Sequence, residues 1–448
     1  MRRGWWKAAA AIAGLPLLAA CLGNNGGTYD EAPRGQPPAR TAASGKAVQA
    51  EGVVTLKLFT ALSDRANGAG KVEQELIDAY MAANPGVKIE VEALQDEPYK
   101  SKIKVYAATN DLPDIIQTWG QASFIKPLID NELLMPLDLG DYVAAGFMPG
   151  AVDGFSQDGN AYGLPRSTDY FLMYYNRKMF ADNGVPIPKT TDELKTTVKK
   201  FRAKGINPIA VNGMDLWSFP IWFEYVHQRL TGDFSLMDRA LRREMPFNAD
   251  SFLAAAREMQ QLAEMGAFAD GYLTADYGTA RNLFGQGQAA MYLLGSWEIG
   301  LATDAAFPDA FRENVGAMAY PASAQATSTG TAVWYGGGYS IARHTRHPEE
   351  AEAFLRYFFQ PEHWAKRLWE KGAGIPASRF ALTGKETALQ KQLLAILEKT
   401  TSRSGTPILD EGTPEWKETI MDLHGKLLEG VITPEAFVEG LDEAASRD

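Results

Sequence analysis

The sequence has few of the residues that most often carry reactive or metal-binding chemistry. It contains one cysteine and five histidines among 448 residues. A single cysteine cannot form a disulfide within the chain. The histidines do not cluster with it, and the close pair His344 and His347 lies in a polar stretch typical of a turn, so we expect no metal site. Nucleophile-elbow, metalloprotease and kinase motifs are also missing.

The chain has no excess of positive charge either. Its 44 lysines and arginines are outnumbered by 55 aspartates and glutamates, and the formal net charge is −11 at pH 7. Such a surface repels the phosphates of nucleic acids and anionic membranes, so we expect neither as a partner. Hydrophobic residues make up 46% of the chain, which is typical of a soluble globular protein. The length suffices for two domains of roughly 100–200 residues each.

The apolar run near the N-terminus is too short to cross a bilayer, which needs about 20 residues. It covers residues 8–20 and follows the basic start Met1–Lys7, an order typical of a secretory signal. Leu18-Ala19-Ala20-Cys21 resembles a bacterial lipobox, in which the cysteine is lipidated and becomes the first mature residue. The alternative is a plain signal peptide with a chance cysteine. Residues 21–52 are rich in Gly, Pro, Ala and polar residues without periodicity, which predicts a flexible tether.

A βαβ unit is predicted directly after the tether. Alternating apolar residues indicate strands at 54–58 and 87–91, and helical spacing indicates a helix at 72–81 between them. Such a unit implies a parallel strand pair with a right-handed crossover. A further strand is expected at 111–120. Because ligands sit at the carboxyl ends of strands in open α/β sheets, Trp119 is a candidate ligand contact, with core packing as the alternative.

The best-defined pattern of the chain lies at 161–194. A Gly–Pro break is followed by an aromatic run at 170–175, a short helical segment that Asn183-Gly184 ends, and a stiff connector with two prolines. Thr190 and Glu193 then have the spacing of a capping box. Each piece taken alone is ordinary for an α/β domain.

Taken together, these segments resemble the extracellular sugar-binding proteins of ABC importers, the group that includes the maltose-binding proteins. The resemblance covers about residues 53–445 in chain order. The segments that carry it are Asn84–Glu92, Asp111–Ile115, Tyr162–Pro165, Tyr174–Asn176, Gly184–Thr190, Asp192–Leu194, Phe284–Met291, Gly295–Trp297, Gly372–Ala377 and Leu427–Ala444.

The resemblance implies a two-lobed α/β fold of the type II periplasmic-binding-protein class, with a mostly parallel sheet and flanking helices in each lobe. We expect a signal peptide at 1–20, a tether at 21–52, an N-lobe from 53–162 plus 322–370, and a C-lobe from 165–318 plus 372–448. The crossings between the lobes are expected near 162–165, 317–322 and 370–372. The lobes would close on a sugar or oligosaccharide and present it to the permease subunits of an ABC importer. The implied protein is a monomer without cofactor, lipid-anchored at the outer face of the cytoplasmic membrane.

Trp297 is the leading candidate for a ligand contact. It follows a predicted buried strand at 291–294, and we expect Ser296 to cap the next helix and hold Trp297 at the mouth of the sheet. A flat indole there suits the apolar face of a sugar ring. The further candidate ligand residues are Trp119, Trp334, Tyr335, Trp217, Glu298, Asp169, Ser63 and Gly337. We assign no catalytic residue and no metal ligand.

Two other functions stay open at this point. A secreted glycosidase would share sugar-stacking aromatics, but it needs two carboxylates about 5–10 Å apart on either side of the bond. The same fold with another ligand, such as a phosphorylated polyol, a peptide or iron, is the second alternative. The acidity of the chain and its aromatic-rich loops favour a neutral ligand.

We predict that Cys21 carries the lipid, because it follows Leu18-Ala19-Ala20 and is the only cysteine of the chain. Metabolic labelling with a fatty acid should tag the wild-type protein and leave the Cys21→Ser variant unlabelled. Equal labelling of the two proteins would rule this site out.

Overall fold

The computed structural model describes residues 52–233, 235–323, 330–400, 403–404 and 406–447. The expected signal peptide, Cys21 and nearly all of the tether lie outside these residues. None of the helices in the described ranges is both long and apolar enough to span a bilayer.

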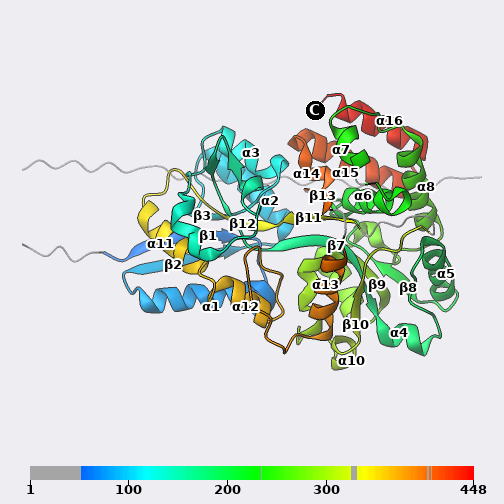
Figure 1. The fold of residues 1–448 in the computed structure, drawn as a ribbon, viewed down its shortest axis with the longest axis horizontal. Coiled ribbons are helices and arrows are strands. Elements are labelled where there is room, and N and C mark those ends of the chain that lie inside the picture. The colour runs from blue at the N-terminus through cyan, green and yellow to red at the C-terminus, as the bar shows by residue number, and fades with distance from the viewer. Residues whose placement is uncertain (1–51, 234, 324–329, 401–402, 405, 448) are drawn as a thin grey trace, which may run out of the picture. The chain divides into compact units, whose positions relative to one another are not determined.

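Two separate sheets organise the described chain (Figure 1). The first has the order β2 (Val87–Ala93), β1 (Val54–Thr60), β3 (Ile115–Trp119), β12 (Gly337–Ile341) and β6 (Leu164–Pro165). The second has the order β13 (Arg403–Ser404), β11 (Thr331–Tyr335), β7 (Thr168–Asn176), β9 (Ala289–Gly295) and β8 (Asn207–Ala210), and β10 (Val315–Met318) also pairs with β7. A small hairpin of β4 (Ser156–Gln157) and β5 (Asn160–Ala161) stands apart.

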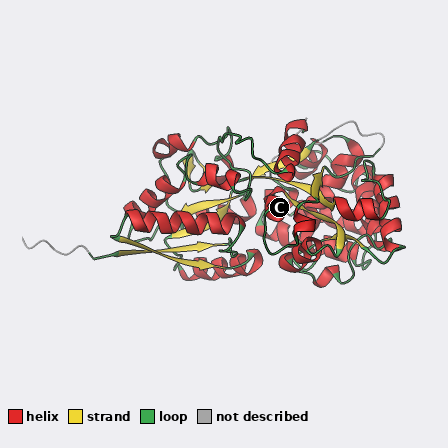
Figure 2. Cartoon of the chain, turned by 90° about the horizontal axis from the view of Figure 1, so that it is seen from below, coloured by secondary structure: helices red, strands yellow, loops and turns green. Residues whose placement is uncertain are grey.

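Helices flank both sheets (Figure 2). Those beside the first sheet are α1 (Gly68–Ala83), α2 (Asp96–Thr109), α3 (Ala122–Asp130), α11 (Pro348–Phe358) and α12 (Trp364–Glu370). Those whose side chains join the core of the second are α4 (Arg177–Asp182), α5 (Thr191–Arg202), α6 (Ser218–Thr231), α7 (Ser235–Leu241), α8 (Asp250–Glu264), α9 (Tyr277–Gly285), α10 (Asp309–Arg312), α13 (Ala388–Lys399), α14 (Ile408–Glu411), α15 (Pro414–Leu428) and α16 (Pro434–Ala445). Short 3-10 turns are η1 (Leu139–Ala145), η2 (Asp153–Phe155), η3 (Tyr272–Thr274) and η4 (Ser296–Ala302).

The predicted βαβ unit is confirmed. Strands β1 and β2 pair in parallel, with Leu56 opposite Ile89, and α1 connects them. The apolar face of α1, which includes Val72 and Leu76, is fully buried against the sheet. Strand β3 continues the parallel arrangement on the other side of β1.

The strand directions are more mixed than the expected mostly parallel sheets. Strand β12 runs antiparallel to β3, and β7 runs antiparallel to β9, β10 and β11. Parallel neighbours need a long crossover, usually a helix. Such crossovers join β1, β2 and β3, whereas β12 follows β11 after Gly336 alone and runs antiparallel to β3.

Within the described residues, the chain passes between the two sheets at three places. Strand β11 still belongs to the second sheet, so the return to the first sheet lies at Gly336 and not near 317–322. The first passage is Arg166-Ser167, between β6 and β7, and the last lies between α12 and α13. Backbone bonds hold the three passages side by side: Gly336 donates to Ser167 (3.0 Å), Thr168 to Ile375 (2.8 Å) and Ala377 to Arg166 (3.2 Å).

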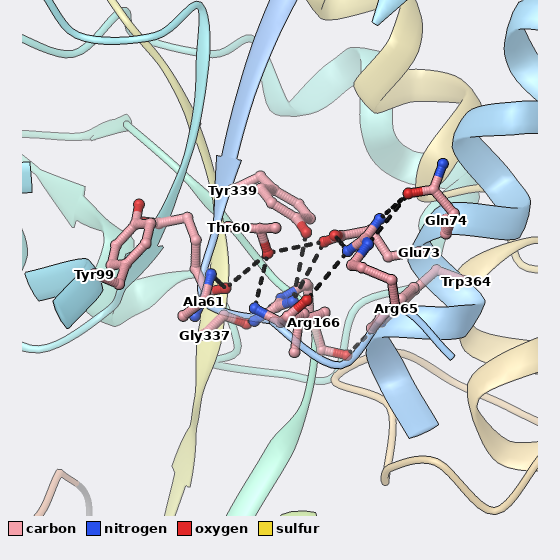
Figure 3. A network of polar contacts seen from close by, with 12 residues as sticks. Thr60, Ala61, Arg65, Glu73, Gln74, Tyr99, Arg166, Gly337, Tyr339 and Trp364 are labelled. Atoms are coloured by element: carbon pink, nitrogen blue, oxygen red, sulfur yellow. Dashed lines mark hydrogen bonds and ion pairs between the residues drawn. The ribbon is translucent and has the colours of Figure 1, made fainter. Parts of the chain in front are cut away.

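A buried charged network lies beside these passages (Figure 3). Glu73 of α1 is fully buried, and its carboxylate forms an ion pair with Arg65 and lies 3.7 Å from Nη1 of Arg166. The Thr60 hydroxyl at the end of β1 lies 3.2 Å from the same carboxylate. The Arg166 Nε donates to the Gly337 carbonyl at 3.3 Å. The network therefore joins β1, α1 and two passages between the sheets.

We predict that Glu73→Gln lowers the free energy of unfolding by about 3–5 kcal/mol, because it removes the carboxylate that pairs with the buried Arg166 guanidinium. Urea unfolding at neutral pH measures the change through the transition midpoint. The matched control is Glu90→Gln, which removes the exposed ion pair of Lys88 and Glu90 and should lower the free energy of unfolding far less. Equal effects of the two substitutions would show that the buried network contributes no more to the free energy of unfolding than an exposed ion pair does.

Candidate functional site

Trp297 lies in η4, the 3-10 turn that begins where β9 ends. Its side chain is half-buried, and the indole folds back over Gly295, where a Cβ would overlap the six-membered ring. The ring centroids of Trp217 and Trp334 each lie 6.0 Å from that of Trp297. We call Trp217, Trp297 and Trp334 the tryptophan cluster. Trp217 and Trp334 are 8% and 7% exposed, so Trp297 presents the accessible indole and the other two support it.

Ser296 does not cap a helix, contrary to expectation. The N-cap position of η4 is Gly295. The Ser296 side chain is buried, accepts a hydrogen bond from the Tyr170 N–H at 3.2 Å and donates to the Thr168 carbonyl at 3.4 Å. Its hydroxyl thus ties η4 to β7, because the strand offers polar backbone groups at the point where η4 begins.

Asp169 lies opposite Trp334 in the pairing of β7 with β11. The carboxylate is buried and accepts a hydrogen bond from the Ser167 hydroxyl at 3.0 Å. It also lies against Gly336, where a Cβ would overlap Oδ2, so the passage needs glycine there. Burial raises the pKa of Asp169 to about 7, although Ser167 and Arg166 act in the opposite direction.

Trp119 and Gly337 meet at the first sheet, where they are paired in β3 and β12. Trp119 is half-buried and its ring packs against Phe124, with centroids 4.9 Å apart. The Lys100 ammonium lies 5.4 Å from the centroid of the Trp119 ring. A Cβ on Gly337 would lie 2.7 Å from Nη2 of Arg166, so this glycine makes room for the buried arginine.

The remaining candidates have different surroundings. Glu298 is 2% exposed, and both its oxygens are bonded inside the protein, one to the Tyr277 hydroxyl and the other to Nε of Arg281 at 2.9 Å. Ser63 is exposed in the loop between β1 and α1. The Tyr335 hydroxyl donates to the Pro149 carbonyl at 3.3 Å. The structure therefore brings Asp169 and the tryptophan cluster together, while Glu298 points into the protein.

Polar groups that the sequence analysis missed lie near Trp119. Lys100 pairs with Asp96 (2.7 Å) and Glu97 (2.9 Å) in the first turn of α2. The pKa of Asp215, which precedes α6, is raised by burial and also by the negative charges of Glu97 and Asp96. The charges at the start of α2 therefore act on the segment before α6, although these elements flank different sheets. In the sequence, Asp96 and Lys100 have the spacing of an ordinary ion pair on a helix surface. This spacing gives no indication that the pair lies beside Trp119.

The described residues include no group of three or more His, Cys, Asp or Glu side chains that could hold a metal ion. The site therefore consists of an aromatic platform, buried carboxylates engaged by the protein, and half-exposed polar groups. Such a lining suits recognition of a small molecule with apolar faces and hydroxyl groups.

We predict that the stability difference between wild type and Asp169→Asn depends on pH. A carboxyl group whose pKa is raised on folding adds stability below its unfolded pKa of about 3.9, and this contribution is lost as the pH rises through the folded value. The advantage of the wild type should therefore fall between about pH 4 and pH 7, by at most about 1.4 kcal/mol per pH unit, and then stay constant. Unfolding in urea across this range measures it.

The control for this experiment is Asp130→Asn, because hydrogen bonds from Lys126 and Gln157 lower the pKa of that exposed carboxyl. Because the pKa of Asp130 is lowered on folding, its contribution changes only below about pH 4, and its removal should leave the stability difference constant from pH 4 to pH 7. A constant difference between wild type and Asp169→Asn from pH 4 to pH 7 would contradict the raised pKa.

The chain matches the family model described as bacterial extracellular solute-binding protein over residues 66–363. It is 23% identical over 327 residues to the multiple sugar-binding protein of Streptococcus mutans serotype c. The aligned region covers 69% of this chain and 72% of that protein.

Two solved structures share the fold. One comes from work on xylan utilization by Caldanaerobius polysaccharolyticus; it has a TM-score of 0.80 and 25% identity and covers 87% of this chain and 99% of that one. The other is a chitin oligosaccharide binding protein with a TM-score of 0.78 and 22% identity, covering 88% of this chain and 98% of that one.

Proposed function

Because the chain belongs to the family of bacterial extracellular solute-binding proteins, we propose that it captures a neutral sugar or oligosaccharide and delivers it to an ABC importer. The observation that supports this most is the half-buried indole of Trp297, backed by Trp217 and Trp334. A rigid aromatic surface of this kind offers an apolar face to the C–H groups of a sugar ring at little entropic cost.

The polar groups beside Trp119 and the carboxyl group of Asp215 suit the hydroxyls of such a ligand. Asp96 and Glu97 outnumber Lys100, and Asp215 adds a further carboxyl group. A negatively charged ligand would be repelled by this excess, whereas neutral hydroxyls can both donate to carboxylates and accept from the ammonium. This charge balance favours a neutral sugar over a phosphorylated ligand.

The buried carboxylates of Asp169 and Glu298 fit a protein that captures a sugar better than one that hydrolyses it. A glycosidase needs one carboxyl group as general acid and a second as base or nucleophile on either side of the substrate. The buried carboxylates nearest the tryptophan cluster are Asp169 and Glu298, and both are engaged by protein groups. On this proposal no bond of the ligand is broken.

The two sheets would form the cores of two lobes that close on the ligand. The passages at Arg166-Ser167, at Gly336 and between α12 and α13 would absorb the motion, since they are the chain segments that link the sheets. Ligand binding would shift the population towards the closed form, which the importer recognises. A lipid on Cys21 and the tether at 21–52 would hold the protein at the outer face of the cytoplasmic membrane.

The proposal is tested by incubating the purified protein with maltotriose, raffinose, xylotriose and chitotriose. Thermal unfolding and product release are measured on the same samples. We expect at least one sugar to stabilise the protein, by about 2.7 kcal/mol at one hundred times the dissociation constant, without release of product. Release of shorter sugars would show that the protein hydrolyses the ligand, and would contradict the proposed capture without reaction. Stabilisation only by a phosphorylated polyol, a peptide or iron would change the ligand class.

In the same assay, Trp297→Ala should weaken binding of the stabilising sugar at least about tenfold, or 1.4 kcal/mol, as loss of an aromatic binding hot spot does. If Trp297 served only the core, the substitution would instead cost about 3–5 kcal/mol of stability and leave the affinity unchanged. Calorimetry of binding and the unfolding midpoint of the free protein separate these outcomes.

A further inference from the structure

A second buried charge cluster lies behind Trp297. Arg281 of α9 contacts two carboxylates: its Nε lies 2.9 Å from Oε2 of Glu298, and its Nη1 lies 2.9 Å from Oδ2 of Asp304. Both carboxylates are buried, at 2% and 5% exposure. The guanidinium also lies over the Phe307 ring, 4.8 Å from its centroid. One arginine thus holds a residue inside η4 and another just after η4 ends.

Stability alone is a weak reason for such a cluster. Removing charges from water is costly, and well-packed apolar residues often stabilise a buried position as well as an ion pair does. The guanidinium is planar and donates in fixed directions, so an arginine that bonds two carboxylates fixes their relative position. Burial alone would lower the pKa of Arg281, but the charge of Glu298 raises it, so the arginine stays charged.

The cluster is connected to Trp297 by one peptide bond, because Glu298 is the next residue. On the other side of Trp297, the Ser296 hydroxyl is bonded to β7. A 3-10 helix such as η4 has poorer hydrogen-bond geometry than an α-helix. The direction of the Trp297 side chain therefore depends on these two anchors and on its packing over Gly295.

We propose that Arg281 is a positioning residue for ligand binding: through Glu298 and Asp304 it holds η4 so that the Trp297 indole is in its binding orientation before the ligand arrives. The Tyr277 hydroxyl, which donates to the other oxygen of Glu298, assists it. This inference rests on the proposed capture of a sugar by Trp297. A platform held in place in advance strengthens binding because less conformational freedom is lost when the ligand binds.

This role differs from a direct contact of Glu298 or Arg281 with the ligand. A residue that acts through Trp297 contributes nothing once the indole is removed. A residue that contacts the ligand itself contributes equally with or without the indole. Additivity of the two substitutions therefore separates these roles, as in any double-mutant cycle.

The experiment compares the wild type, Arg281→Gln, Trp297→Ala and the double variant, all as the full chain. The probe is whichever of maltotriose, raffinose, xylotriose and chitotriose stabilises the wild type most, and calorimetry gives its affinity. We expect Arg281→Gln to weaken binding about tenfold in the wild-type background and less than about twofold in the Trp297→Ala background. The matched control is Arg257→Gln, which removes an exposed ion pair with Glu435 and should leave the affinity unchanged.

Tyr277→Phe keeps the test valid if Arg281→Gln fails to fold, because it removes only a hydroxyl and leaves the ion pairs intact. It should weaken binding about two- to threefold in the wild-type background and leave the affinity of Trp297→Ala unchanged. Equal losses in both backgrounds, or no loss in either, would overturn the positioning role while sugar capture stands. If the wild type binds none of the four sugars, the proposed function fails and the positioning role fails with it.

Discussion

The contacts of Arg166 determine how the two sheets are joined. Its guanidinium pairs with the buried Glu73 of α1, its backbone N–H donates to Gly337, and its carbonyl accepts from Ala377. One residue thus contacts the first sheet, its flanking helix and the linking segment between α12 and α13. A buried charge without a partner costs several kcal/mol, so these groups favour one arrangement strongly. Lobes that close on a ligand would move about this fixed point.

The strand directions decide which residues meet. Strand β12 follows β11 after one residue, runs antiparallel to β3 and places Gly337 beside Trp119. Strand β11 itself runs against β7 and places Trp334 beside Asp169. The candidate site is therefore built where the chain leaves one sheet for the other, and its geometry depends on the passages as much as on the strands.

Buried carboxylates in this molecule serve the scaffold more than the ligand. Glu73 compensates Arg65 and Arg166, and Glu298 compensates Arg281. Each ion pair fixes a segment that carries a candidate site residue. On the proposed function, recognition would be left to the Trp297 indole and to half-exposed polar groups.

Local sequence patterns determined the elements, and the tertiary structure decided their partners. The βαβ unit, the cap at Thr190 and the buried strand that leads to Trp297 were predictable, because side-chain periodicity and capping act between residues a few positions apart. The partners of Glu298 and the sheet to which β11 belongs were not. Sequence marks Glu298 only as an acid beside a tryptophan, while its bonds to α9 exist because packing buries the group and burial requires compensation.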